Sequence, residues 1–138
     1  MLRKFINHFW PTFKPLEEKI LNLIGEKLPE DIQRLYNGQL EEVNKVYRVV
    51  WRESNLYYMK GGAYCFDSPH NIKCSLEEMK FATVTFSLED ISLRVIAELW
   101  LVKGRIFSIT YNQNMSKHAT KVDFSDIEVE IYYKGEDP

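Results

Sequence analysis

The stretch from residue 95 to residue 111 constrains the fold most, because it reads as one β-hairpin that is apolar on both faces. Its turn is expected at Lys103-Gly104, since glycine accepts the backbone conformation that a tight turn requires. With Val102 opposite Arg105, side chains alternate between the two faces along both strands. One face then carries Ile96, Trp100, Val102, Phe107, Ile109 and Tyr111, and the other carries Val95, Ala97, Leu99, Leu101 and Ile106. Helices can cover one face, so the other needs a curled sheet, the N-terminal segment or another protein.

Two amphipathic helices are predicted before the strands. Pro15 suits the first turn of a helix that ends at Gly25, and its apolar face carries Leu16, Ile20, Leu23 and Ile24. A second, short helix is expected from Pro29 to Asn37-Gly38, a pair typical of a helix end. A chain of 138 residues can bury the core of one domain. We therefore expect a single α+β domain over residues 1–138, with N-terminal helices packed on a curled, mainly antiparallel sheet built from hairpins.

Alternating apolar residues predict the other strands. A hairpin that begins at Val43 is expected to turn at Ser54-Asn55, which would place Trp51 opposite Tyr58. We also expect a loop over 61–74 with a short strand at 63–66, a short helix over 75–80, a strand at 81–88, a helical turn at 87–90, an extended segment at 121–124 and an edge strand at 127–133.

Charge and hydropathy argue against several kinds of partner. The formal charge is −2, so the chain has no general attraction to nucleic acid or to an anionic membrane. No apolar run approaches the roughly 18 residues of a membrane span, and the N-terminus lacks the cleavage site of a secretory signal. We therefore expect a cytoplasmic protein without nucleic-acid or membrane partners, in which Cys65 and Cys74 are reduced thiols.

Few residues suggest chemistry. The residues Cys65, Asp67, His70 and Cys74 are all of metal-ligating types, but their spacing matches no zinc module, and no acid is identifiable that would orient a Cys–His pair. Glu98 lies between Ile96 and Trp100 on the hairpin, where a carboxylate among aromatic rings could act as an acid or a base. The simpler expectation is that Glu98 reaches solvent at a strand end or pairs with a lysine. We predict no enzyme activity, no metal and no cofactor.

Aromatic residues make up 14% of the chain, which indicates core filling or contact surface. The candidate binding residues are Trp51, Tyr57, Tyr58, Trp100, Phe107 and Tyr111. An aromatic N-terminal arm carries Phe5, Phe9, Trp10 and Phe13. This arm would either cover the sheet of its own chain or anchor a partner, and a swapped dimer would satisfy both.

A family resemblance rests on the run from Gly25 to Asp31, which includes Leu28-Pro29, followed by Tyr36-Asn37-Gly38. After an amphipathic helix and before a strand-rich remainder, these residues resemble the opening of the SUKH superfamily, many of whose members look like bacterial toxin-immunity proteins. The resemblance covers about twenty-five residues. The interval between Leu28-Pro29 and Asn37-Gly38 is shorter than in that family, and the family's later Gly- and Asp-rich turn with its Trp is not recognisable. The resemblance implies a non-enzymatic binder whose sheet face or loops block a toxin domain.

Two functions therefore compete. The first is a non-enzymatic protein-binding module that holds a protein partner or a second copy of the chain as a homodimer. The second is a small enzyme or ligand-binding protein with a pocket between sheet and helices around Glu98, to which Arg105 or Tyr111 would add polar contacts. A flat or convex aromatic patch favours the first function, and a closed cavity with a second titratable group beside Glu98 favours the second.

Overall fold

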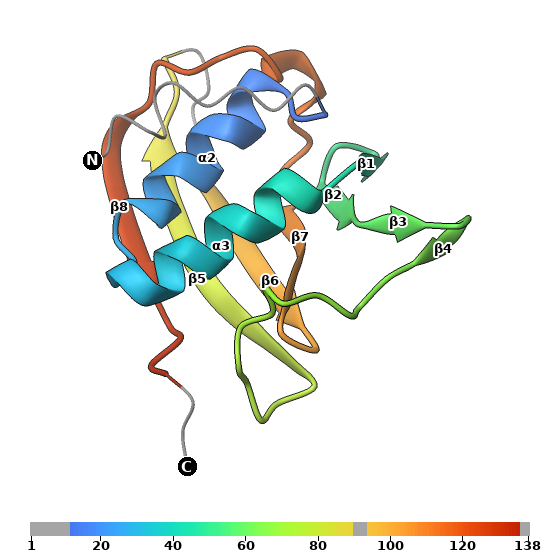
Figure 1. Cartoon of the computed structure of the whole chain (residues 1–138). Helices are drawn as coiled ribbons and strands as arrows, with labels where there is room; N and C mark the ends of the chain where they lie inside the picture. The colour runs from blue at the N-terminus through green and yellow to red at the C-terminus, as the bar shows by residue number, and fades with distance from the viewer. Residues whose placement is uncertain (1–11, 90–93, 136–138) are drawn as a thin grey trace.

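Residues 12–89 and 94–135, which the computed structural model describes, form two α-helices and an antiparallel sheet of six strands (Figure 1). The helices are α2 (Pro15–Gly25) and α3 (Glu30–Glu42). In spatial order the sheet contains β1 (Lys45–Val49), β2 (Glu53–Tyr57), β7 (Arg105–Tyr111), β6 (Val95–Val102), β5 (Glu78–Ser87) and β8 (Ser125–Ile131). A separate two-stranded sheet pairs β3 (Met59–Lys60) with β4 (Ala63–Tyr64), and a 3-10 helix, η1, covers Ser116–His118.

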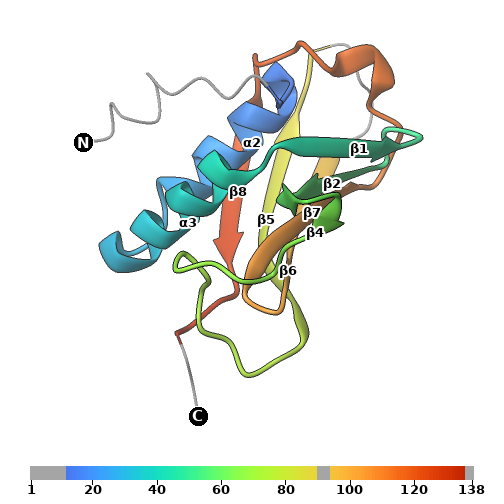
Figure 2. The same ribbon diagram turned by 45° about the vertical axis from the view of Figure 1, so that its right-hand side comes forward.

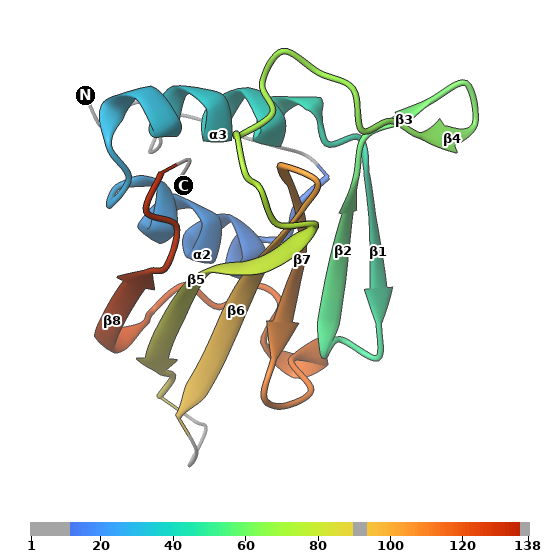
Figure 3. The same ribbon diagram turned by 90° about the horizontal axis from the view of Figure 1, so that it is seen from below.

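Both helices lie on one face of the sheet, which bends around them (Figures 1, 2 and 3). The core between the two layers is apolar and includes Leu16, Ile20, Phe81, Val84 and Leu99. Within the described residues, no α-helix lies on the opposite face (Figure 3). The small β3–β4 sheet covers one end of that face, because Tyr64 of β4 packs on Tyr57 of β2 and on Phe107 of β7. The structure thus confirms an α+β fold with N-terminal helices on a mainly antiparallel sheet, and the sheet is open, with β1 and β8 at its edges. Neither described helix has the length and apolarity to cross a membrane.

The first helix has its predicted bounds, whereas the second is longer than expected. α2 begins at Pro15 and ends at Gly25. α3 continues through Asn37-Gly38 to Glu42, so the prediction of a helix end at this pair was wrong. Gly38 instead permits close packing, because a Cβ atom at this position would lie 2.3 Å from Cδ2 of the His70 ring.

The predicted turn of the first hairpin is also wrong. The sequence predicted it at Ser54-Asn55, but β1 ends at Val49 and β2 begins at Glu53, so the turn lies around Val50 and Trp51. These two residues form the turn with φ angles of 50° and 51°, and Val49 pairs with Glu53. Trp51 therefore lies in the turn and not opposite Tyr58. Valine and tryptophan rarely adopt left-handed backbone, so the sequence carries no signal for a turn here.

The second hairpin turns where the sequence predicts. Val102 is opposite Arg105, and the left-handed φ angles of 50° and 80° fall on Lys103 and Gly104. Gly104 also packs closely against the preceding loop, because a Cβ atom there would lie 2.5 Å from the carbonyl oxygen of Ile72. The tip of the hairpin is thus fixed by residues from outside the hairpin.

A bulge in β7 changes which side chains share a face. Ile106 is opposite Leu101, but Ser108 is opposite Trp100, so Phe107 is an extra residue in β7. Strict alternation predicted Ile109 and Tyr111 on the face of Trp100, and that prediction was wrong. Beyond the bulge these two residues lie opposite Leu99 and Ala97 on the helix-covered face, and all four side chains are buried.

The remaining segments differ from expectation in detail. The short helix predicted over 75–80 is absent, since β5 begins at Glu78 and the carbonyl of Glu77 accepts a hydrogen bond from the Lys103 amide. The short strand expected at 63–66 is the two-residue β4, residues 121–124 form no strand, and the edge strand β8 begins at Ser125. The turn predicted at 87–90 lies partly outside the described residues, as do Phe5, Phe9 and Trp10 of the aromatic arm, whereas Phe13 is buried.

Candidate functional site

The face of the sheet away from the helices, which we call the open face, is the best candidate for a functional surface. Its composition follows from the strand register, because residues opposite each other on neighbouring antiparallel strands lie on the same face. One row of such residues crosses all six strands and consists of Val49, Glu53, Thr110, Glu98, Thr83 and Glu130. We call it the carboxylate row. A second row contains Tyr47, Asn55, Ser108, Trp100 and Lys80, and a third contains Ile96, Thr85 and Glu128.

Within the carboxylate row, acidic and threonine side chains alternate from strand to strand. Glu53 on β2 and Glu98 on β6 are separated by Thr110 on β7, and Glu98 and Glu130 are separated by Thr83 on β5. Neighbouring strands lie about 4.8 Å apart, so consecutive carboxylates are spaced by roughly 10 Å across the sheet. The three rows together hold four carboxylates, on Glu53, Glu98, Glu128 and Glu130, and one lysine, Lys80.

Apolar side chains accompany these charges on the open face. Ile96 is 40% exposed and Tyr47 is 55% exposed. Trp100 is half-buried, and its indole N–H donates a hydrogen bond of 3.2 Å to the hydroxyl of Thr110 in the carboxylate row. This contact holds the ring on the surface of the sheet beside Glu98. The open face therefore combines apolar contact area with an excess of negative charge.

The charge of Glu98 is partly neutralised by Lys80 on the neighbouring strand β5, which agrees with the expectation of a lysine partner. Its carboxylate lies 3.4 Å from Lys80 Nζ, and its other oxygen accepts a 3.4 Å hydrogen bond from Thr110. Both charged side chains are about one-third exposed. The small depression at Glu98 has a volume of about 160 Å³, less than the roughly 300–1,000 Å³ of typical small-molecule pockets. It is also lined by Ile96, Thr110, Tyr111 and Asn112.

The six aromatic residues predicted to bind a partner do not form one patch. Tyr57 and Phe107 come together with ring centroids 6.0 Å apart, and both pack against Tyr64 at 5.5 Å. Tyr64 also contacts Phe66 at 4.4 Å. The sequence prediction missed Tyr64 and Phe66, although their alternation in a predicted short strand indicated two rings on one side. These rings cover one another where β4 meets the β6–β7 hairpin.

The other four predicted residues lie apart. The guanidinium of Arg48 is 5.0 Å from the Trp51 ring, and that of Arg105 is 5.1 Å from the Tyr58 ring. Trp100, a predicted binding residue, lies in the second row of the open face. Tyr111 is buried under the helices at 7% exposure, and burial together with the nearby Glu17 carboxylate raises the pKa of its hydroxyl well above the ordinary value. Tyr111 therefore offers little surface to a partner.

A polar network that the sequence did not predict joins α3 to the loop before β5 and to the hairpin tip. Arg105 is 1% exposed and donates to Glu42 at 2.7 Å and to Asn71 at 3.2 Å. Ser68 and His70 also contact the Glu42 carboxylate, His70 through Nδ1 at 2.9 Å. Burial alone would raise the pKa of Glu42, but the hydrogen bonds from these side chains outweigh it and lower the pKa.

Gln39 completes this network, because its side-chain amide hydrogen-bonds main-chain groups at the hairpin tip as a neighbouring strand would. Its side chain is fully buried. The amide nitrogen donates to the carbonyls of His70 at 2.8 Å and Gly104 at 2.9 Å, while the amide oxygen accepts from the Ile106 N–H at 2.7 Å. The network thus has a structural role in fixing the tip, with no free acid–base pair beside a cavity.

A second buried charge connects α2 to the β1–β2 hairpin. Glu17 is fully buried and accepts hydrogen bonds from the Lys14 amide, from Nε and Nη2 of Arg48 and from the Ser54 hydroxyl, at 2.7–2.9 Å. Arg48 is 20% exposed. Ser54, predicted as a turn residue, is instead a donor to this carboxylate.

The loop that carries Cys65, Asp67, His70 and Cys74 brings no ligand set together. Both cysteines are free thiols, and Cys74 Sγ lies 3.5 Å from Met79 Sδ. His70 faces Glu42 and not either thiol. In the described ranges, no group of three His, Cys, Asp or Glu residues is arranged to hold a metal ion.

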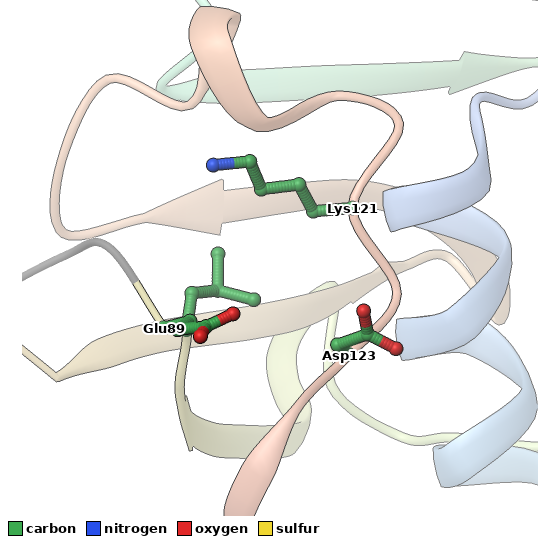
Figure 4. A pocket seen from close by; sticks show the side chains of 4 residues that line it. Glu89, Lys121 and Asp123 are labelled. Carbon is green, nitrogen blue, oxygen red and sulfur yellow. The ribbon is translucent and has the colours of Figure 1, made fainter.

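Three larger depressions lie away from Glu98. The first, of about 340 Å³, is lined by Leu88 and Glu89 after β5 and by Lys121 and Asp123 before β8 (Figure 4). The second, of about 410 Å³, lies between α3 and the chain after β8 and includes Ile32, Leu35 and Tyr133. A third, of about 270 Å³, is lined in part by Cys74, Ser75 and Tyr133. None of the three contains Glu98, and the described lining residues of the third include no histidine that could activate Cys74 or Ser75.

Comparison of the chain with protein-family models, curated proteins and solved structures finds no match. The resemblance of its N-terminal part to the SUKH superfamily stays a prediction.

Proposed function

We propose that the chain is a non-enzymatic protein-binding module that holds its partner on the open face. The observation that carries this proposal is a sheet face that no α-helix covers among the described residues, on which Trp100, Ile96 and Tyr47 lie among carboxylates. Exposed aromatic and aliphatic side chains at the centre of a polar surface are typical of protein interfaces.

An enzyme or ligand carrier around Glu98 is less well supported. The polar neighbours of Glu98 are Lys80 and Thr110, and neither provides the second acid or base that general acid–base chemistry needs at neutral pH. The depression beside Glu98 is also too small for most metabolites.

The finer form of the proposal is a toxin-immunity protein, which rests on the resemblance of residues 25–38 to the SUKH opening. In that form the partner is a toxin domain, and the chain blocks it by occupying its functional surface. Self-association through the open face is disfavoured, because two copies would bring like charges together.

Affinity capture from the native host with single-residue variants tests the proposal. Ile96→Asp places a charge in the third row of the open face, and Val122→Asp places the same charge on a residue of similar exposure, 44% against 40%, outside the three rows. We expect one protein to be captured by the wild type and by Val122→Asp but lost with Ile96→Asp. For the immunity form, equimolar wild-type chain should also abolish the toxicity of the captured partner.

Three results would contradict the proposal. The first is a partner that Ile96→Asp still binds with wild-type affinity. The second is a purified wild-type protein that is strictly monomeric by light scattering and captures no protein. The third is substrate turnover that is abolished by Glu98→Gln, which would support the enzyme alternative instead.

A further inference from the structure

The carboxylate row has a regular spacing that restricts what the open face can bind. Glu53, Glu98 and Glu130 recur on every second strand, which separates them by roughly 10 Å along a line across the sheet. Glu130 is exposed, Glu53 is half-buried, and the Glu98 side chain is 33% exposed. All three carboxylates can therefore be approached from the same side.

Two of the protein's own cations contact carboxylates on this face, and they offset part of the charge. Arg94 lies 4.0 Å from Glu128, which is outside the carboxylate row. Lys80 contacts Glu98 at 3.4 Å and also lies 5.1 Å from the Tyr132 ring, so it is shared between two neighbours. Glu130 accepts a hydrogen bond from the Tyr132 hydroxyl at 3.1 Å, which leaves its charge in place. A partner with cationic side chains would gain attraction along the row, whereas phosphate backbones and anionic lipids would be repelled.

A second observation on the same face points to a hydrogen-bond donor. Asn55 lies in the row next to the carboxylates, between Tyr47 and Ser108, and is 8% exposed. Its amide oxygen is buried and has no hydrogen-bond donor. Buried acceptors are normally satisfied, and lysine and arginine side chains carry donors but no acceptor.

From this charge complementarity we infer that the partner on the open face presents a basic segment, with Lys or Arg side chains spaced about 10 Å apart so that they meet Glu53, Glu98 and Glu130 in turn. This inference rests on the proposed function and names the chemistry of its partner. Residues seven apart in an α-helix are about 10.5 Å apart, and residues three apart in a polyproline II segment are about 9.3 Å apart. Either conformation fits the row, while a second copy of this acidic face does not.

Selection from a display library of random 15-residue peptides against the immobilised full-length chain tests the inference. The deciding variant is Glu53→Gln/Glu98→Gln/Glu130→Gln. Its matched control is Glu26→Gln/Glu30→Gln/Asp31→Asn, which removes the same three charges from exposed positions on the helical side of the molecule.

We expect the selected peptides to carry Lys or Arg at intervals of seven or three residues. Their affinity should fall about tenfold for the row variant and less than twofold for the control, because each exposed ion pair contributes a factor of roughly 1.4–5. The affinity should also fall as salt rises from 50 to 300 mM.

The outcomes separate this inference from the proposed function. Peptides that bind the open face without basic residues, or that bind the row variant as tightly as the wild type, would overturn the basic-partner inference and leave the protein-binding proposal intact. Both would be overturned if none of the selected peptides lost binding to the Ile96→Asp variant and no partner protein were captured. Peptides that bind the control variant as weakly as the row variant would show that only net charge matters, which also overturns the inference.

Discussion

Replacing Glu17 with alanine should lower the free energy of unfolding by about 3 kcal/mol. The carboxylate is fully buried and accepts four hydrogen bonds, two of them from Arg48, so its removal leaves the Ser54 hydroxyl and a guanidinium without their acceptor. Breaking a buried ion pair from one side costs about 3–5 kcal/mol. Because Arg48 keeps 20% exposure and can regain water, we expect the lower end, about 3 kcal/mol.

Urea unfolding followed by far-UV circular dichroism measures this loss. With a denaturant slope of about 2 kcal/mol/M, the midpoint should fall by about 1.5 M. Glu26→Ala, an exposed residue just after α2, is the control and should change the free energy of unfolding by less than about 0.5 kcal/mol. A double-mutant cycle with Arg48→Ala should give a coupling energy of about 2 kcal/mol.

Two results would refute this reasoning. A loss below about 1 kcal/mol for Glu17→Ala would mean that the site collapses or hydrates without cost. A coupling energy below about 0.5 kcal/mol would mean that the two side chains stabilise the protein independently, so that the contact between α2 and the β1–β2 hairpin depends on packing alone.

Three further changes probe other features. Gly38→Ala should lower the free energy of unfolding by about 1 kcal/mol, although alanine usually stabilises a helix, because its Cβ would collide with the His70 ring. In a His70→Ala background the same change should raise the free energy of unfolding by about 0.5 kcal/mol. An increase in both backgrounds would contradict the packing argument. Glu42→Gln should cost about 3 kcal/mol at pH 7 by leaving buried Arg105 unpaired. Since the folded pKa of Glu42 is lowered, its contribution is present above the unfolded pKa and is lost as pH falls through the folded pKa. The urea midpoints of variant and wild type should therefore converge as the pH is lowered below the folded pKa. Val50→Asn should raise the free energy of unfolding by about 1 kcal/mol, because asparagine tolerates left-handed backbone and the 68% exposed valine loses little contact; an unchanged thermal midpoint would refute this.

The sequence predicted the fold class because its periodicities were strong. Leu16, Ile20 and Ile24 mark the buried face of α2, and Lys103-Gly104 marks the central turn. Local signals failed where tertiary contacts decided the outcome. Gly38 reads as a helix end but makes room for a ring from a distant loop, which no pattern within α3 reveals.

The open face could be predicted only in part. Glu98 and Trp100 were identified as unusual, but their grouping with Glu53 and Glu130 depends on the pairing of strands far apart in the sequence. The extra residue at Phe107 reversed the alternation in β7 and moved Tyr111 under the helices. A bulge has no reliable sequence signature, so period-2 alternation fails beyond it.

The buried amide of Gln39 affects how the central hairpin opens. Hairpins are commonly loosest at the tip, whereas here Gln39 hydrogen-bonds main-chain atoms of Gly104 and Ile106 on either side of Arg105. Local unfolding should therefore start at the opposite end of β6 and β7, and amide hydrogens near the tip should exchange among the slowest in the protein. Local opening that reaches Trp100 would then begin at the Ile96 end of β6. Gln39, which lies on the helix-covered side of the sheet, thus limits the motion of Trp100 on the open face.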